Sequence, residues 1–270
     1  MALQLRLGVV IGWLGLHLAK RRRHIANVNL QLCFPALSDD ERAALLAATF
    51  RSTGIAVLET ALAWLRPPET LQARVTLTGV EHLDAAMADG RGVLMLGGHF
   101  ATLDIAGALL SRVAKFAVTY RPSSNPLVEQ LMRAARLRLY DGVIEHGDAR
   151  AIARRLRAGG AVWYAADQDF GPRHSVFAPF FGVPAATITA ASRFVRMHRS
   201  RAVFVSFFRD EHPWRWRIDI RPIEFGSDDV AQDARIINAL IEAEARQAPA
   251  QYLWLHRRFK TRPAGEARPY

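Results

Sequence analysis

The 270-residue chain is 50% apolar and 23% charged, a composition that excludes a disordered, collagen-like or coiled-coil protein. Its formal net charge is +11 at pH 7, which predicts anionic partners: nucleic acid, an acidic lipid surface or an acidic carrier protein. The single cysteine, Cys33, excludes an internal disulfide. We interpret it as a packing residue of a protein in a reducing compartment.

The first residues combine an apolar run with a basic cluster. After Arg6, about a dozen apolar residues extend to position 19, fewer than the roughly 20 that a membrane-spanning helix needs. Lys20 and three arginines follow at once, where a signal peptide would have small residues at a cleavage site. Two interpretations remain: a buried core helix, or a helix in a membrane interface whose basic cluster, residues 20–23, binds anionic headgroups.

Capping and breaker residues predict a helical first third. Ser38 with Glu41 forms a capping box that starts a helix continuing to residue 65, and Pro67 and Pro68 end it. From residue 91 onward, short apolar strands alternate with helices. The expected strands are 91–97, 115–120, 142–144, 161–167, 201–208 and 214–220, and the expected helices are 100–112, 125–138, one capped by Asp148 that ends at Gly159, 186–199 and 229–247.

This alternation predicts an α/β fold with a mixed, mostly parallel sheet flanked by helices and a helical amino-terminal portion. The last two strands are expected to join the sheet antiparallel. The sequence contains no repeat or linker that would divide it, so we expect a single domain over 1–270. Its parts would be a membrane-associating interfacial helix (1–23), a helical portion (24–68) and an α/β core with the site (69–270).

The stretch Gly97-Gly98-His99-Phe100-Ala101-Thr102-Leu103-Asp104 lies just past a strand, where open α/β sheets place their ligands. In a regular helix His99 and Asp104 would be about 140° apart, so they meet only if His99 precedes the first turn. A carboxylate on one imidazole nitrogen fixes the tautomer and leaves the other nitrogen as a base. The alternative interpretation is a helix-capping histidine beside an exposed aspartate.

Several further segments accompany this motif in a fixed order. They are Asn29-Leu30-x-Leu32-Cys33-Phe34-Pro35, Tyr120-Arg121-Pro122 with Asn125-Pro126, 163–172 (WYAADQDFGP), 175–182 (SVFAPFFG) and 252–263 (YLWLHRRFKTRP). Together with the histidine motif they resemble the late lipid A acyltransferases, and the match covers almost the whole chain. The resemblance implies a fold like that of the glycerolipid acyltransferases. Many members have Glu at the position of Asp104, and either carboxylate can orient a histidine.

The resemblance implies transfer of a fatty acyl group from acyl carrier protein to a hydroxyl of a lipid A precursor, with no cofactor and no metal. A thioester is already activated, so a positioned general base is enough. His99 would be this base and Asp104 its partner. Arg136 aligns with an arginine that is proposed to stabilise the oxyanion in relatives. The alternative interpretation of Arg136 is a solvated arginine on a helix face.

Five further residues are expected at the substrates. Arg121 follows a strand end and could bind a phosphate of the acceptor or the phosphopantetheine of the carrier, although a structural salt bridge is nearly as plausible. Asp167 and Asp169 lie at the same edge of the sheet. They lack the further oxygen ligands of a divalent-cation site, so we interpret them as hydrogen-bonding supports. Phe177 and Phe180, on an apolar loop, form either a core plug or an acyl-chain pocket.

The carboxyl-terminal segment HRRFKTR, residues 256–262, interleaves cations with an aromatic residue. Such a segment suits a membrane interface beside anionic sugars and phosphates, and it also suits nucleic acid. By the resemblance, we assign Arg257 and Arg258 to the lipid acceptor. The chain length of the acyl group depends on pocket depth, so no motif predicts it.

Two alternatives to this function stay open. One is an acyltransferase for another membrane glycolipid or a lysophospholipid. The other is a basic nucleic-acid-binding protein, although no helix-turn-helix, zinc-finger or RNP signature accompanies the charge. The preferred hypothesis places the protein on the cytoplasmic face of the cell inner membrane, with acyl carrier protein, a lipid A precursor and anionic inner-membrane lipids as its partners.

Overall fold

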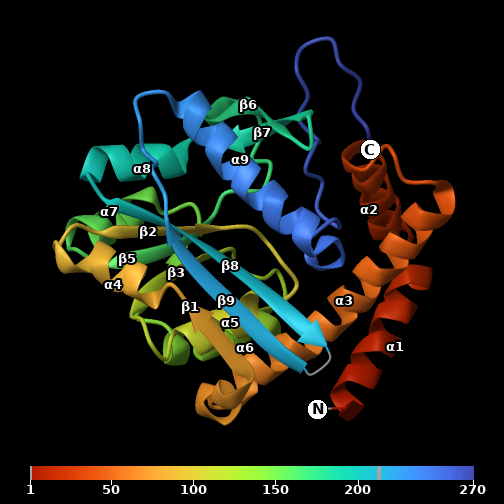
Figure 1. Ribbon diagram of the computed structural model, residues 1–270, viewed down its shortest axis with the longest axis horizontal. Coiled ribbons are helices and arrows are strands. Elements are labelled where there is room, and N and C mark those ends of the chain that lie inside the picture. Colours follow the sequence, from red (N-terminus) through yellow and green to blue (C-terminus); the bar gives the residue numbers. More distant parts are fainter. Residues whose placement is uncertain (1, 212–213) are drawn as a thin grey trace.

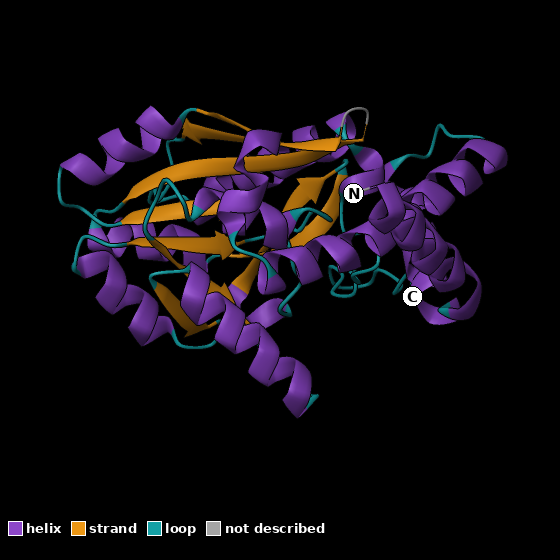
Figure 2. Cartoon of the chain, turned by 90° about the horizontal axis from the view of Figure 1, so that it is seen from below, coloured by secondary structure: helices purple, strands orange, loops and turns teal. Residues whose placement is uncertain are grey.

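A seven-stranded mixed sheet with helices on both faces forms the centre of the computed structural model, which describes residues 2–211 and 214–270 (Figures 1 and 2). The strand order is β1-β9-β8-β2-β5-β3-β4. Neighbouring strands from β8 to β4 are parallel, and β9 runs antiparallel to β8. The strands are β1 Val75–Thr78, β2 Val93–Gly97, β3 Phe116–Tyr120, β4 Gly142–Glu145, β5 Ala161–Ala165, β8 Arg201–Glu211 and β9 Trp214–Pro222. The predicted fold class is confirmed, including the antiparallel pair at the end.

The helices divide between the sheet and a separate amino-terminal group. Helices α1 Ala2–Leu18, α2 Lys20–Cys33 and α3 Asp39–Leu65 lie together at one side of the sheet (Figure 1). The others are α4 Val80–Ala88, α5 Leu103–Leu110, α6 Pro126–Leu139, α7 Ala149–Arg157, α8 Ala190–His198 and α9 Val230–Gln247, with short 3-10 turns at Pro68–Arg74, Pro172–His174 and Pro249–Gln251.

Local signals set the helix starts where they were predicted. The Ser38 hydroxyl accepts a hydrogen bond from the Glu41 amide at 3.3 Å, and the Glu41 carboxylate accepts one from the Ser38 amide at 2.8 Å. Asp148 accepts a hydrogen bond from the Ala151 amide at the start of α7. These side chains satisfy amide groups that the first helical turn leaves without partners.

The structure corrects the predicted helix over 186–199. Its first residues belong instead to β7, Val183–Ile188, which pairs antiparallel with β6, Ser175–Phe180, in a separate hairpin. Helix α8 starts at Ala190. The alanine-rich run is compatible with either structure, and pairing with β6 decides it, because tertiary context overrides propensity. Strand β1 and helix α4 were not predicted.

Helices α1 and α3 pack closely through glycines. A Cβ on Gly12 would lie 2.4 Å from the Phe50 carbonyl oxygen, and a Cβ on Gly54 would lie 2.2 Å from the Gly12 nitrogen. Helix α3 is long and apolar enough to cross a membrane by length and composition. Its Glu59, however, forms a buried 2.8 Å ion pair with Arg209 of β8, as expected of a helix packed against the sheet.

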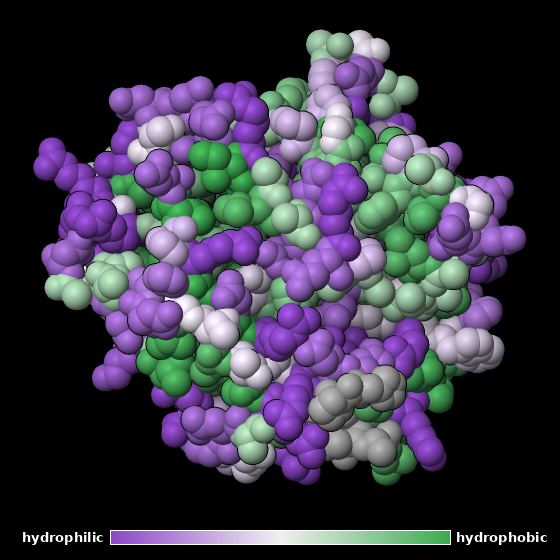
Figure 3. Space-filling view, in the orientation of Figure 1, coloured by the Kyte–Doolittle hydropathy of each residue, from purple (hydrophilic) through white to green (hydrophobic). Residues whose placement is uncertain are grey.

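The other face of α1 is unusually apolar for a surface. Its exposed large side chains are Leu3, Leu7, Val10, Ile11, Trp13, Leu14 and Leu18. The basic residues 20–23 that follow are exposed as well. Hydrophobic and polar side chains alternate at the surface over the amino-terminal helices (Figure 3). One face of α1 therefore packs on α3, and the opposite face leaves apolar side chains exposed.

Candidate active site

His99 lies two residues past the end of β2, at the carboxyl edge of the parallel strands. The chain turns here through Gly98, and a Cβ on Gly98 would be 2.9 Å from the Ile241 side chain and 3.4 Å from the Asp167 carboxylate. The carbonyl oxygen of His99 accepts a hydrogen bond from the Leu253 amide at 3.0 Å. The close packing of Gly98 and the hydrogen bond from Leu253 therefore fix the position of the histidine backbone.

Asp167 is the carboxylate that binds His99. Its Oδ1 lies 2.6 Å from the imidazole Nδ1, and its Oδ2 accepts a hydrogen bond from the His99 amide at 2.8 Å. Strand β5 is the parallel neighbour of β2, with Gly97 opposite Ala165, so both residues emerge side by side. With Nδ1 donating to Asp167, the unprotonated Nε2 is left as a base. The Gln168 amide nitrogen lies 3.3 Å from Nε2.

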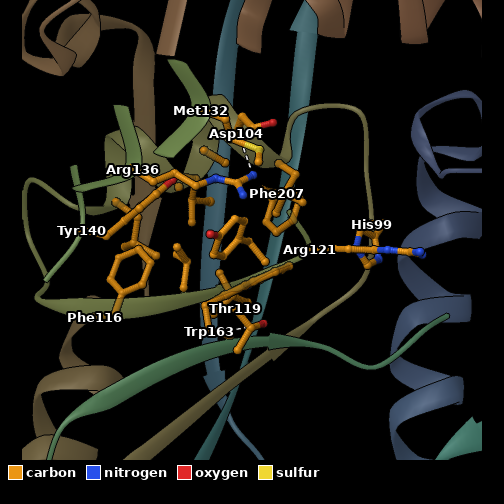
Figure 4. A pocket seen from close by; sticks show the side chains of 18 residues that line it. His99, Asp104, Phe116, Thr119, Arg121, Met132, Arg136, Tyr140, Trp163 and Phe207 are labelled. Atoms are coloured by element: carbon orange, nitrogen blue, oxygen red, sulfur yellow. Dashed lines mark hydrogen bonds and ion pairs between the residues drawn. The ribbon is translucent and has the colours of Figure 1, made fainter. Parts of the chain in front are cut away.

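The predicted hydrogen bond between His99 and Asp104 is corrected by this geometry. Asp104 Oδ1 lies 3.4 Å from the Arg136 guanidinium (Figure 4), and its Oδ2 accepts a hydrogen bond from the Thr60 hydroxyl at 3.2 Å. Helix α5 begins at Leu103, so Asp104 already sits in its first turn and faces α3 and α6. Asp104 therefore acts on His99 through space.

Charge at the site favours a protonated imidazole. Burial by itself lowers the pKa of His99, but the carboxylates of Asp167 and Asp104 outweigh it and hold that pKa above its ordinary value. For Asp167, burial raises the pKa, but His99 and Arg258 outweigh this effect and lower the pKa to about 2. Both carboxylates thus stabilise an imidazolium that forms when His99 takes up a proton.

Two cavities meet at His99. The first, of about 210 Å³, extends between α5, α6 and the sheet and is mainly apolar, with Asp104, Arg121 and Arg136 as its charged lining residues. The second, of about 590 Å³, continues past Arg121 and is lined by Glu145, His146, Gln168 and Phe170 among others. The imidazole therefore stands where an apolar chamber joins a more polar one.

Arg136 and Arg121 reach this junction from different elements. Arg136, on α6, was predicted as an oxyanion-stabilising residue, and its guanidinium lies 5.5 Å from the Tyr120 ring, inside the apolar cavity rather than on a solvated helix face. Arg121 directly follows β3 and lines both cavities, as expected from its place at a strand end. The structure brings both arginines to the same chamber as His99.

Asp169 supports the site and does not line either of these cavities. It accepts hydrogen bonds from the Thr261 amide at 2.8 Å, the Thr261 hydroxyl at 2.9 Å and the Gly171 amide at 2.8 Å. Asp167 likewise binds the backbone and ring of His99. The predicted role of hydrogen-bonding supports agrees with these contacts, and the predicted contact of the two aspartates with substrate is corrected.

The carboxyl-terminal segment closes over this edge of the sheet. Asn29 of α2 donates hydrogen bonds to the Trp254 carbonyl at 2.6 Å and to the His256 carbonyl at 2.8 Å. Burial, the largest effect, and nearby cations lower the pKa of His256 to about 4 despite Asp167. His256 is therefore neutral at pH 7, and its Nε2 accepts a hydrogen bond from the Asp169 amide at 3.4 Å.

Phe177 and Phe180 do not line either cavity at His99, so their assignment to an acyl-chain pocket is corrected. Both lie on β6, where Phe177 is exposed and Phe180 is buried. The Phe180 ring packs against Phe181, Tyr252 and Phe259. The core-plug alternative therefore describes Phe180.

Arg258 is a structural residue, which corrects its assignment to the lipid acceptor. It is 2% exposed and donates hydrogen bonds to the Ala186 carbonyl, the Thr187 hydroxyl and the Asn238 side-chain oxygen at 2.7–3.0 Å. Arg257 differs, because it lines a separate basic recess with Lys260 and Arg268. Of the predicted pair, Arg257 alone stays available to an anion.

We expect Arg258→Ala to lower the free energy of unfolding by about 1–3 kcal/mol, because it removes three buried hydrogen bonds that the guanidinium donates to Ala186, Thr187 and Asn238. Thermal or urea denaturation measures the effect. Arg257→Ala is the matched control and should leave stability within about 0.5 kcal/mol. Equal stability of the two variants would contradict the structural role of Arg258.

Sequence reasoning missed three residues beside the imidazole or its cavities. Gln168 approaches Nε2, Trp163 packs its ring edge-to-face against His99 with centroids 6.4 Å apart, and His146 stacks on Phe170 with centroids 4.4 Å apart. Gln168 directly follows Asp167 past the end of β5, so the strand-end rule that singled out Asp167 could have found it, whereas Trp163 lies in the middle of that strand.

An acyltransferase needs a base for its acceptor and an apolar channel for its acyl chain, and this edge of the sheet supplies both. In agreement, residues 2–261 match the family described as bacterial lipid A biosynthesis acyltransferase, and the chain belongs to this family. It is 38% identical over 266 residues to the lipid A biosynthesis palmitoleoyltransferase of Escherichia coli (strain K12), which covers 98% of this chain and 87% of the relative.

Two further relatives from the same organism carry different acyl names. The lauroyltransferase is 38% identical over 265 residues, covering 96% of this chain and 86% of the relative. The myristoyltransferase is 32% identical over 272 residues, covering 98% of this chain and 82% of the relative. Family membership favours the enzyme over the nucleic-acid-binding alternative. Across residues 2–211 and 214–270, no three His, Cys, Asp or Glu side chains gather as a metal site.

Proposed function

We propose that this chain transfers a fatty acyl group from the thioester of acyl carrier protein to a hydroxyl of a lipid A precursor, with His99 as general base. The observation that carries the proposal is the position of the imidazole. Its Nδ1 is held at 2.6 Å by buried Asp167, and Nε2, which is 3.3 Å from the Gln168 side-chain nitrogen, belongs to a ring that lines both the apolar and the more polar cavity. The apolar cavity takes the acyl chain, and the junction takes the reacting groups.

The reaction needs one proton carrier. His99 Nε2 takes the proton of the acceptor hydroxyl while the hydroxyl oxygen bonds to the thioester carbon. The tetrahedral intermediate then collapses, its carbon–sulfur bond breaks, and the imidazolium returns the proton to the departing thiolate. Asp167 keeps the imidazole in the tautomer that this exchange requires and stabilises the charge it carries in between.

Cationic side chains in the apolar cavity stabilise the negative charge of the tetrahedral intermediate. Arg136, paired with Asp104 at 3.4 Å, is positioned by that carboxylate to donate toward the oxyanion. Arg121, which lines both cavities, binds a phosphate of the acceptor or of the phosphopantetheine arm. Arg257, in its separate basic recess, is proposed to meet an anionic group of the acceptor outside the reaction centre.

Incubation with acyl carrier proteins of defined chain length and a lipid A precursor, followed by mass spectrometry of the lipid, tests this function. The expected result is an ester-linked acyl group on the precursor and none in the absence of carrier. A parallel reaction with a lysophospholipid separates the acceptor classes. Acylation of the lysophospholipid alone would replace the proposed acceptor, and no acylation of either would overturn the function.

We further propose that α1 holds the enzyme at the cytoplasmic face of the inner membrane, with its apolar face in the bilayer interface and residues 20–23 on anionic headgroups. Replacing these four basic residues with glutamine should weaken binding to vesicles containing anionic lipid by about 1 kcal/mol per charge. Sedimentation with neutral vesicles is the control and should be unaffected. Equal binding of both proteins to anionic vesicles would show that another surface docks.

A further inference from the structure

The apolar cavity has His99 on one side and extends away from it between α5, α6 and the sheet (Figure 4). Helix α5 begins just after His99, so Asp104, Gly107 and Leu110 line the cavity at steps of about 4.5 Å along the helix. On the opposite wall, β3 runs from Phe116 to Tyr120 beside Arg121, a length of about 13 Å. Phe116 therefore lies about one strand length from the reaction centre.

Two aromatic rings line the cavity on the side away from His99. Figure 4 shows Phe116 and Tyr140 on the side of the cavity far from His99. Tyr140 follows α6, and its ring centroid lies 5.3 Å from that of Phe116. A Cβ on Gly107 would be 2.5 Å from the Tyr140 hydroxyl oxygen, so the phenol rests directly against the α5 backbone. The Tyr140 ring thus reaches from the β3 side to α5.

We propose that Gly107, Phe116 and Tyr140 form the floor of the acyl-chain cavity and set the longest chain that the enzyme transfers efficiently. This inference rests on the proposed acyl transfer. A chain that is too long must displace a ring from a closely packed wall or leave methylenes outside the cavity. A chain that is too short leaves the floor unfilled. The differing acyl names of the relatives fit a length that each protein sets by local shape.

Tyr140→Ala and Gly107→Ala test the floor in opposite directions. The substrates are saturated acyl carrier proteins from decanoyl to palmitoyl, and the readout is kcat/KM for each. Tyr140→Ala deepens the cavity and should move the preferred chain to a longer one. Gly107→Ala adds a methyl where the phenol now sits and should move it to a shorter one. We expect the ratio of kcat/KM between adjacent lengths to change by about 10-fold or more.

A double variant makes the contact itself testable. Tyr140→Phe removes the oxygen that a Cβ on Gly107 would meet, so adding it to Gly107→Ala should restore much of the original preference. Leu137→Ala, in the last turn of α6 just before Tyr140 but at a residue that is 52% exposed, is the matched control and should keep the wild-type profile. Phe116→Leu and Tyr140→Leu are milder changes that keep the core filled if Tyr140→Ala fails to fold.

The outcomes separate the floor from the function. Folded, active Tyr140 and Gly107 variants with the wild-type chain-length profile would overturn the floor while leaving acyl transfer intact. A wild-type enzyme that transfers no chain of any length would instead overturn the proposed function. Binding of free fatty acids of the same lengths, monitored as the increase in Tm that each one causes, tests the floor without catalysis. If the Tm increase depends on chain length in the same way in the wild type and in both the Tyr140 and Gly107 variants, the floor is again contradicted.

Discussion

Replacing His99 by alanine is expected to lower the rate of acyl transfer by about 10²–10⁴-fold, since the reaction loses its general base while the thioester stays activated. The measurement is single-turnover acylation of a lipid A precursor at saturating acyl carrier protein. The variant loses the imidazole from the lining of the apolar cavity and keeps the other lining side chains, so the affinity for the acyl donor should change little.

His82→Ala is the matched control for this experiment. His82 is exposed on α4 and lines neither of the two cavities at His99. It should retain the full rate and the wild-type Tm. A His99→Ala enzyme that keeps more than half of the wild-type rate would remove the imidazole from the mechanism.

Asp167→Asn should lower the rate by about 10²-fold or more, because asparagine can bind Nδ1 without favouring the productive tautomer. It should also shift the pH profile. The carboxylate raises the pKa of His99, and the base is inactive while the imidazole is protonated, so wild-type activity rises with pH through that raised pKa. Without the charge the pKa falls, and the acidic limb of the profile moves to lower pH.

Two neighbouring aspartates distinguish this effect from a structural one. Asp169→Asn removes a buried carboxylate that holds Thr261, so it should lower Tm without moving the acidic limb. Asp104→Asn releases Arg136 and should lower the maximal rate, with a smaller shift of the limb because Asp104 acts on His99 through space. A limb that moves with Asp104→Asn and not with Asp167→Asn would return the partner role to Asp104.

Local chemistry made part of this site readable from the sequence. A buried run ending in Gly97-Gly98 identified a strand that delivers His99 to the carboxyl edge of a sheet, and the structure has it there. The same rule placed Asp167 at that edge. It did not pair them, because the adjacency of β5 and β2 depends on strand order, which periodicity does not encode.

Long-range contacts also explain the other differences. The exposure of Arg258 could not be judged from a basic run, since its acceptors on Thr187 and Asn238 belong to β7 and α9. The pocket was assigned to Phe180 because a cluster of phenylalanines is typical of both a core and a binding site. Because β6 pairs with β7 in a hairpin, the Phe180 side chain is buried in the core.

The junction between the two ends of the chain bears on when the enzyme can first work. Asn29 is hydrogen-bonded to the Trp254 carbonyl, 225 positions away, and Leu253 binds the carbonyl of His99. A nascent chain that has already formed β2 and β5 still lacks these two hydrogen bonds until the residues after 250 leave the ribosome. Contacts of such sequence separation close late. The imidazole therefore acquires its full surroundings only after residues 253 and 254 have been synthesised and have folded back onto β2 and α2.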